Sequence, residues 1–167
     1  MNNIKKIGLS ALAGSLVMTS VNAVEYSMSG NAKVEWASQD HSAGIAATNG
    51  GRTNMVPDVS QNSTYVLPTP VAGLTFKFIY IGAATDTSSH IWQTAGNSIY
   101  FKGVLMHHDL NQTGQTSNVV FSDGNSNSQI TLAVPESYEI TFVGVSSTVY
   151  AVSGHTGGNT PVAFADQ

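Results

Sequence analysis

The chain has 167 residues, no cysteine and a formal net charge of −4. Six basic residues against ten acidic ones cannot form the basic face that nucleic-acid binding requires, which excludes nucleic acid as a partner. A chain without cysteine has neither disulfides nor thiolate-bound metal, so strand pairing, packing or oligomerisation must stabilise its fold.

The first 23 residues show the features of an export signal in the expected order. Two lysines precede an apolar stretch, 7–18, which is too short to cross a bilayer as a helix. Val21 and Ala23 occupy the −3 and −1 positions of a cleavage site, so we expect cleavage after Ala23. The alternative is an ordinary buried N-terminal helix. The mature chain, 24–167, would reach the periplasm, the cell envelope or the medium with a formal charge of −6, because two of the six basic residues leave with the signal.

Hydrophobic periodicity beyond the signal predicts β-strands, and no segment has the spacing of a confident amphipathic helix. The clearest strand, 74–81, has four large side chains on one face: Leu74, Phe76, Phe78 and Tyr80. Its other face becomes apolar at Ile79 and Ile81, which predicts burial on both sides in the second half. Further strands are predicted at 24–29, 32–37, 63–67, 89–94, 98–106, 117–121, 128–134, 137–144 and 147–153.

Turn residues separate these strands at intervals of about ten residues, which predicts an all-β fold, an antiparallel β-sandwich of jelly-roll type. The stretch 39–58 is rich in small and polar residues and is expected to be a linker or long loop. We therefore divide the chain into a signal peptide, 1–23, a flexible N-terminal arm with its linker, 24–58, and a β-sandwich domain, 59–167.

The last three predicted strands lie so close in sequence that we expect them to form a meander with tight connections. The predicted core combines the apolar face of the strand 74–81 with Ile130, Leu132, Ile140 and Phe142.

His107, His108 and Asp109 form a cluster with the character of metal ligands. On a strand, His107 and Asp109 share a face and two donors could meet one Zn²⁺, but no third ligand has a matching spacing. We therefore expect a strand that ends at Met106 and continues into a polar loop, without a metal. The other histidines adjoin turn residues and are expected at the surface or in loops: His41, His90 and His155.

Residues 123–127 (DGNSN) look like the start of an oxygen-rich calcium loop. An EF-hand loop needs Gly at its sixth position and Glu at its twelfth, where this chain has Ser128 and Val134. A turn centred on Asp123 and Gly124 accounts for the same residues, because Gly permits a positive φ and the Asp side chain bonds the nearby backbone. We predict a turn.

Residues capable of catalysis do not form a recognisable set. No G-x-S-x-G motif places a nucleophilic serine. Glu136 and Glu139 are close enough to be considered as the paired carboxylates of a glycoside hydrolase, but both flank the turn expected after Pro135, where solvated charges are common. We assign no catalytic, cofactor-binding or metal-binding residue and expect neither an enzyme nor a cofactor.

The aromatic residues allow two interpretations. They could line a sugar-binding groove, or they could form the core and the faces of the sheets, which is the commoner arrangement. The residues in question are Trp36, Trp92, Tyr26, Tyr65, Tyr80, Tyr100, Tyr138 and Tyr150. Carbohydrate binding is kept as an alternative.

The N-terminal part of the chain resembles a known family. Residues 24–30 (VEYSMSG) and 32–36 (AKVEW) follow the signal, and residues 1–37 are similar to the signal and first strand of small porins from marine Gram-negative bacteria. This resemblance implies the bacterial envelope. A porin needs about sixteen long strands, and a membrane strand about nine to eleven residues, so this chain is not expected to insert into a membrane as a porin does.

The main body, 59–165, resembles a different family. Its segments 63–78, 96–103 and 149–156 are similar to small β-domains of marine phage virions, of the head-decoration or fibre type. The resemblance rests on a Leu-Pro and Gly-Leu strand entry, a central Gly-x-Tyr/Phe strand and a strand near the C-terminus that contains Tyr150. It implies a β-domain on the surface of a virion.

These observations predict a non-enzymatic structural or surface-interaction module, similar to a virion decoration or fibre protein, that acts through oligomeric contacts between β-domains. Its expected partners are copies of itself, for example in a trimer, a capsid or envelope surface, or glycans. Two alternatives stay open: a small outer-membrane β-barrel or porin-associated envelope protein, and an extracellular carbohydrate-binding domain.

Overall fold

The structure, a computed structural model, describes residues 25–28, 31–35, 44–83, 86–110 and 116–167, with side chains from residue 44 onward. The expected signal peptide and its cleavage site lie outside the described residues. The elements are β1 (Glu25–Met28), β2 (Asn31–Glu35), the short 3-10 helix η1 (Ala47–Asn49), β3 (Thr53–Val56), β4 (Ser63–Val66), β5 (Thr75–Tyr80), β6 (His90–Gln93), β7 (Tyr100–Asp109), β8 (Ser117–Phe121), β9 (Gln129–Leu132), β10 (Pro135–Ser146), β11 (Val149–Gly158) and β12 (Ala163–Ala165).

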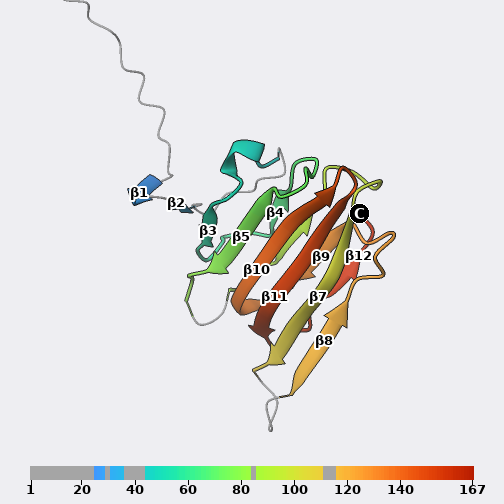
Figure 1. Cartoon of the computed structure of the whole chain (residues 1–167). Helices are drawn as coiled ribbons and strands as arrows, with labels where there is room; N and C mark the ends of the chain where they lie inside the picture. The colour runs from blue at the N-terminus through green and yellow to red at the C-terminus, as the bar shows by residue number, and fades with distance from the viewer. Residues whose placement is uncertain (1–24, 29–30, 36–43, 84–85, 111–115) are drawn as a thin grey trace, which may run out of the picture.

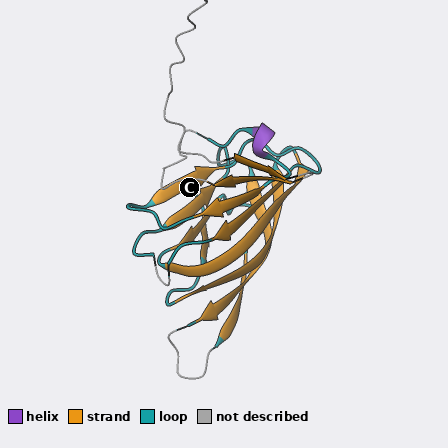
Figure 2. Cartoon of the chain, turned by 90° about the vertical axis from the view of Figure 1, so that its left-hand side faces the viewer, coloured by secondary structure: helices purple, strands orange, loops and turns teal. Residues whose placement is uncertain are grey.

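The strands form two sheets that pack face to face, so the fold is all-β and sandwich-like (Figure 1, Figure 2). One sheet has the strand order β1-β2-β3-β5-β10-β11-β7-β8. Its part β3-β5-β10-β11-β7-β8 forms one layer of the sandwich. The other layer is the sheet β12-β9-β6-β4. The prediction of an all-β fold with two packed sheets is confirmed.

The predicted antiparallel arrangement is wrong, because both sheets are mixed. The parallel pairs are β2–β3, β3–β5, β11–β7 and β4–β6. From β3 to β6 the chain alternates between the two sheets. The chain leaves β3, forms β4 in the opposite layer and returns as β5, which lies parallel to β3. In the same way β6 returns to the sheet of β4 and lies parallel to it. A jelly roll belongs to the antiparallel architectures, so that description does not fit these strands.

Two further expectations are corrected by the topology. The predicted meander is wrong for β9: only β10 and β11 pair as neighbours, whereas β9 lies in the other sheet between β6 and β12. The stretch expected to be a linker contains η1 and β3, and β3 pairs with β5 inside the larger sheet. Its alternating burial, with Asn54 and Val56 inside, identifies β3 as a strand that composition alone concealed.

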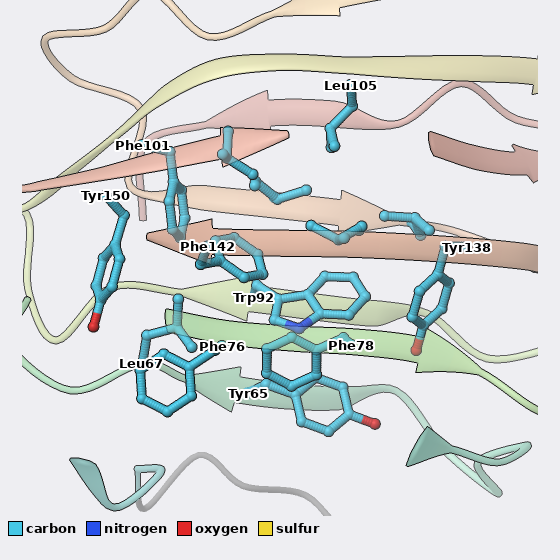
Figure 3. Packing of buried hydrophobic residues seen from close by; sticks show 14 of the residues in the cluster. Tyr65, Leu67, Phe76, Phe78, Trp92, Phe101, Leu105, Tyr138, Phe142 and Tyr150 are labelled. Atoms are coloured by element: carbon cyan, nitrogen blue, oxygen red, sulfur yellow. The ribbon is translucent and has the colours of Figure 1, made fainter. Parts of the chain in front are cut away.

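Aromatic side chains from both sheets meet in the centre of the sandwich (Figure 3). The ring centroid of Trp92 on β6 lies 5.6 Å from the ring centroid of Tyr65 on β4 of the same sheet. It lies 5.6 Å from Phe78 on β5 and 5.1 Å from Tyr138 on β10, both in the opposite sheet. Phe142 on β10, 5.7 Å from Phe78, completes this aromatic cluster. All five side chains are buried, and each such pair adds about 0.5–1.5 kcal/mol beyond the burial of its area.

The predicted core is confirmed, with Ile130 and Leu132 on β9 of the smaller sheet and the other members in or next to β5 and β10 of the larger sheet. Most of its members are buried and two, Leu74 and Tyr80, are partly buried against the others; the buried ones are Phe76, Phe78, Ile130, Leu132, Ile140 and Phe142. The expected burial of both faces at the end of β5 is wrong. Ile79 is half-buried and Ile81 is 43% exposed, because the two described sheets pack through their inner faces and leave these positions on the outside.

Gly103 permits the close approach of two parallel strands. It lies in β7 opposite Val152 of β11 and has a φ of +153°. A Cβ atom at this position would come within 1.9 Å of the Val152 carbonyl oxygen. Because backbone atoms cannot move aside as a side chain can, the β7–β11 contact depends on glycine here.

We expect Gly103→Ala to lower the free energy of unfolding by about 1–3 kcal/mol, the range typical of overpacking. Gly96→Ala is the matched control, since no atom lies within 4 Å of a Cβ at that position. Urea unfolding followed by tryptophan fluorescence measures both variants. Equal midpoints would contradict the close β7–β11 contact.

Candidate functional site

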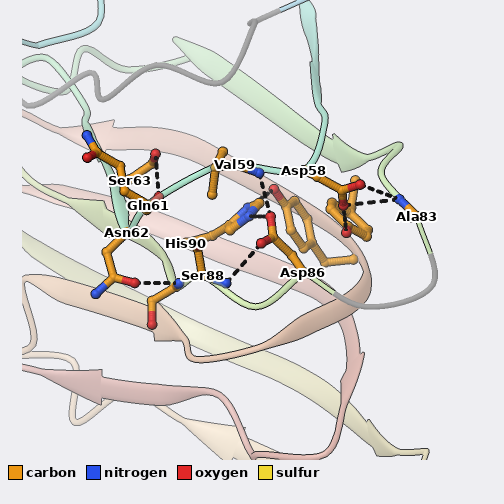
Figure 4. Close-up of polar contacts among 12 residues, drawn as sticks. Asp58, Val59, Gln61, Asn62, Ser63, Ala83, Asp86, Ser88 and His90 are labelled. Carbon is orange, nitrogen blue, oxygen red and sulfur yellow. Dashed lines mark hydrogen bonds and ion pairs between the residues drawn. The ribbon is translucent and has the colours of Figure 1, made fainter.

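A buried polar network joins β6, β10 and the loop that precedes β6 (Figure 4). His90 Nε2 lies 2.9 Å from Asp86 Oδ2, and His90 Nδ1 lies 2.8 Å from the hydroxyl oxygen of Tyr138. The Asp86 carboxylate also accepts the backbone N–H of Val59 at 2.6 Å and that of Ser88 at 2.9 Å. Asp86, His90 and Tyr138 are called the buried polar network below.

The expectation that His90 lies at the surface is wrong, because its side chain is completely buried. On β6, His90 and Trp92 are two residues apart and therefore point to the same face of the sheet. That face is the core. The alternation His-Ile-Trp in the sequence could have predicted this burial. Residues two positions apart on a strand share a face, so a tryptophan in the core places the histidine in the core as well.

His90 is neutral in this arrangement. Burial lowers its pKa, while the hydrogen bond and charge of Asp86, and the charge of Asp58, act in the opposite direction and do not prevail. The neutral ring donates from Nε2 to Asp86 and accepts the hydroxyl proton of Tyr138 at Nδ1, so every polar atom has a partner. A second proton, on Nδ1, would leave the hydroxyl proton of Tyr138 without its acceptor. Burial also raises the pKa of Tyr138 well above its usual range.

A second polar cluster borders this network. Tyr80 donates its hydroxyl proton to Asp58, and the backbone N–H of Ala83 donates to the same carboxylate at 3.0 Å. These bonds, the one from Tyr80 foremost, lower the pKa of Asp58. The Tyr80 ring lies 5.7 Å from His90 and 5.5 Å from Tyr138. The two clusters together close one end of the core.

The buried polar network contains the residue types of general acid–base catalysis, but its side chains are buried below the surface. Its three side chains are each at most 3% exposed. A catalytic acid or base must come within hydrogen-bonding distance of its substrate. The arrangement therefore fixes the start of β6 against β10 and Val59, which is a structural task.

His107, His108 and Asp109 lie on β7, which runs through Asp109 and not only to Met106 as expected. His107 is buried with Nδ1 2.9 Å from the Thr156 hydroxyl oxygen, and burial lowers its pKa. His108 Nδ1 lies 2.9 Å from the Ser117 hydroxyl oxygen. Neighbouring residues of a strand point to opposite faces, so the two histidines do not converge. Among the described residues, no group of three or more His, Asp or Glu side chains is arranged to hold a metal ion.

The predicted turn at 123–127 is confirmed. Gly124 has a φ of +77°, and one oxygen of the Asp123 carboxylate accepts the backbone N–H groups of Asn125, Ser126 and Asn127 at 3.0–3.1 Å. The Ser126 hydroxyl donates to the other carboxylate oxygen. These bonds, that of the Ser126 hydroxyl foremost, hold the pKa of Asp123 well below its usual range. The carboxylate is thus occupied by its own loop.

The remaining candidates also have structural surroundings. The expected turn after Pro135 lies instead before it, at 133–134, so Glu136 and Glu139 are both part of β10, and Glu139 forms a 2.7 Å ion pair with Lys77 on β5. Trp92 is buried at the centre of the core, so it cannot serve as a sugar-binding surface. His155 is exposed on β11, as expected. Trp36 and His41 lie outside the described residues.

Exposed apolar side chains gather on the outer face of β7 and β8. Met106 pairs with Val119, and Val104 pairs with Phe121, so these four side chains lie together on one face. Phe121 is 69% exposed, Val119 51% and Met106 46%. We call these four residues the β8 edge patch. Apolar groups that cluster on a surface indicate a contact site, whereas scattered ones do not.

Both strands of the β8 edge patch were predicted from the sequence, but their pairing was not. The sequence predicts which side chains of one strand share a face. Only the register of β7 against β8 brings Met106 beside Val119. The sequence therefore did not predict the β8 edge patch.

Protonation of His90 is expected to make stability depend on pH. The unfolded chain binds a proton at this residue as the pH falls through the ordinary histidine value of 6.5, whereas the folded chain does so only at a lower pH. The contribution of neutral His90 to the free energy of unfolding is therefore fully present above pH 6.5. It decreases below that pH, with a slope of at most about 1.4 kcal/mol per pH unit for one proton. His107 acts in the same direction.

Thermal unfolding between pH 7.5 and 5 measures this dependence. His90→Gln is expected to be less stable than the parent protein at pH 7.5 and to lose less stability as the pH falls. His155→Gln, at an exposed position of β11, is the control for removal of a histidine. Identical pH slopes for His90→Gln and the parent protein would contradict the neutral, buried state of His90.

No protein-family model, no curated protein and no solved structure matches the chain. In the part of the chain that the structure describes, no helix is long and apolar enough to span a membrane. The resemblances of residues 1–37 and 59–165 therefore stay predictions.

Proposed function

We propose that the protein is a non-enzymatic structural or surface-interaction module, exported to the cell envelope or carried on a virion surface, that works through contacts between β-domains. Its partners in this proposal are copies of itself and the protein surface of a capsid or envelope. The β8 edge patch is the observation that supports it most directly.

The patch supplies the apolar area that a protein contact needs. Fully burying one large apolar side chain contributes roughly 1.5–3 kcal/mol relative to leaving it in water. Phe121, Val119 and Met106 are about half exposed or more, so about half of this free energy is not used within the described fold. A partner that covers them would recover it.

Four polar residues with the chemistry of site residues support the same proposal, because they bond to other groups of the same chain. His90 and Asp86 serve the core, Asp123 serves its own loop, and Glu139 is paired with Lys77. Charged residues are only 10% of the chain, against about a quarter in ordinary globular proteins. A surface of this kind presents little charge that must be desolvated when another protein approaches.

Phe121→Lys tests the proposal. Sedimentation velocity of the full chain over a range of concentrations is expected to show reversible association that this variant weakens roughly tenfold or more, because a charge replaces a contact residue. Val145→Lys is the matched control, since Val145 is also apolar and 56% exposed but lies outside the patch. A chain that stays monomeric at all concentrations and binds neither envelope nor virion preparations would contradict the proposal.

A further inference from the structure

Resting on the proposed function, we infer that the partner at the β8 edge patch is a second copy of this chain, and that the two copies join by antiparallel pairing of β8 with β8 about a two-fold axis at Val119. The backbone of β8, the charge of the strand and the state of the edges of the smaller sheet each support this arrangement.

The backbone groups of β8 alternate between β7 and the free edge. Ser122 donates its N–H to Gly103 of β7, and Asp109 of β7 donates to Thr116, which identifies both as hydrogen-bonded pairs. Because such pairs alternate along an antiparallel ladder, Val120 and Asn118 also bond to β7. The N–H and C=O groups of the residues between them therefore point away from β7; these residues are Ser117, Val119 and Phe121.

The outward groups have no partner within the described part of the chain. β8 is the last strand of its sheet, and no described residue forms a backbone hydrogen bond with Val119 or Phe121 on that side. Proteins usually protect such an edge with Lys, Pro, a bulge or a covering segment. The residues of β8 are Ser, Asn, Val, Val and Phe, so the strand has no charge and no proline.

The edges of the smaller sheet are treated differently. β4 has a covering segment, since Ile45 is buried and donates its N–H to the Val66 carbonyl oxygen at 2.8 Å. β12 is only three residues long, which makes it a poor template for pairing. β8 is longer, and although β12 of the smaller sheet lies near it, no described segment forms backbone hydrogen bonds with its outer side.

A second copy fits this edge better than an unrelated strand would. Pairing centred on Val119 lets each Val119 exchange backbone bonds with the other, and brings Ser117 of each copy opposite Phe121 of the other. The outer face then has a continuous apolar row, Met106 and Val119 of one copy followed by Val119 and Met106 of the second. Both chains are acidic overall and meet there through strands without charge, so like charges are kept apart.

The size of the contact indicates its strength. An interface based on one five-residue strand lies at the low end of specific interfaces, below about 1,200 Å² in total. The dimer should therefore form reversibly and depend on concentration. This behaviour suits a module that is brought together on a surface, where its local concentration is high.

Single cysteines test the register, because the chain has none of its own. In Val119→Cys the two Cα atoms would lie about 5.5 Å apart, within the range of about 4.4–6.8 Å that a disulfide spans. Mild oxidation of the full chain is expected to convert most of this variant into a disulfide-linked dimer. Val145→Cys, exposed but far from β8 in the sheet order, is expected to remain mostly monomeric.

Ser117→Cys is the control on the same strand and face. In the proposed register its two copies are offset by four residues, about 13 Å along the strand, so it should not form a dimer with itself. A mixture of Ser117→Cys and Phe121→Cys chains should form the mixed dimer, because these positions face each other. Val119→Pro, which removes an outward N–H and no bond to β7, should weaken association at least about tenfold, whereas Val119→Thr should not.

The outcomes separate this inference from the proposed function. If the chain associates and Phe121→Lys weakens association, but Val119→Cys forms dimers no faster than Val145→Cys, the two-fold pairing is wrong and the proposed function stands. A trimer by mass would also overturn the pairing alone. Circular dichroism of each variant shows that the sheets are intact, so that a loss of association is not a loss of folding.

Discussion

Aromatic packing between the two sheets is the interaction on which the rest of this structure depends. Trp92 from one sheet contacts Phe78 and Tyr138 from the other, and the chain has no cysteine that could link the layers covalently. Strand pairing holds each sheet together but does not join the two. The burial of these large rings therefore determines how the sheets face each other.

The buried polar network follows from the same packing. A histidine and an aspartate at the end of a core are costly unless every polar atom is bonded, and here Asp86, His90 and Tyr138 satisfy one another. The network lies beside the aromatic cluster, with His90 and Tyr138 each in ring contact with Trp92. Residues that resemble catalytic machinery thus complete the core and connect its end to the loop before β6.

The outer face of the larger sheet differs from its inner face, because apolar side chains on it are exposed. Inside the sandwich the aromatic rings pack against one another, whereas the outer face of β7 and β8 exposes Met106, Val119 and Phe121 beside a strand edge that no other strand of the described chain pairs with. An edge of this kind costs solubility unless another strand covers it. Its position at one side of the larger sheet leaves the core undisturbed, so contact there requires no rearrangement of the aromatic cluster.

The sequence by itself determined the strand character of the chain, the apolar face that includes Phe76 and Phe78, and the turn at 123–127. These features depend on residues two to four positions apart, and their physical cause is local. The tertiary structure alone decided that the sheets are mixed, that His90 lies in the core, and that Met106 meets Val119. Each depends on which distant strands pair and in which register, and period-2 alternation is the same for parallel and antiparallel partners.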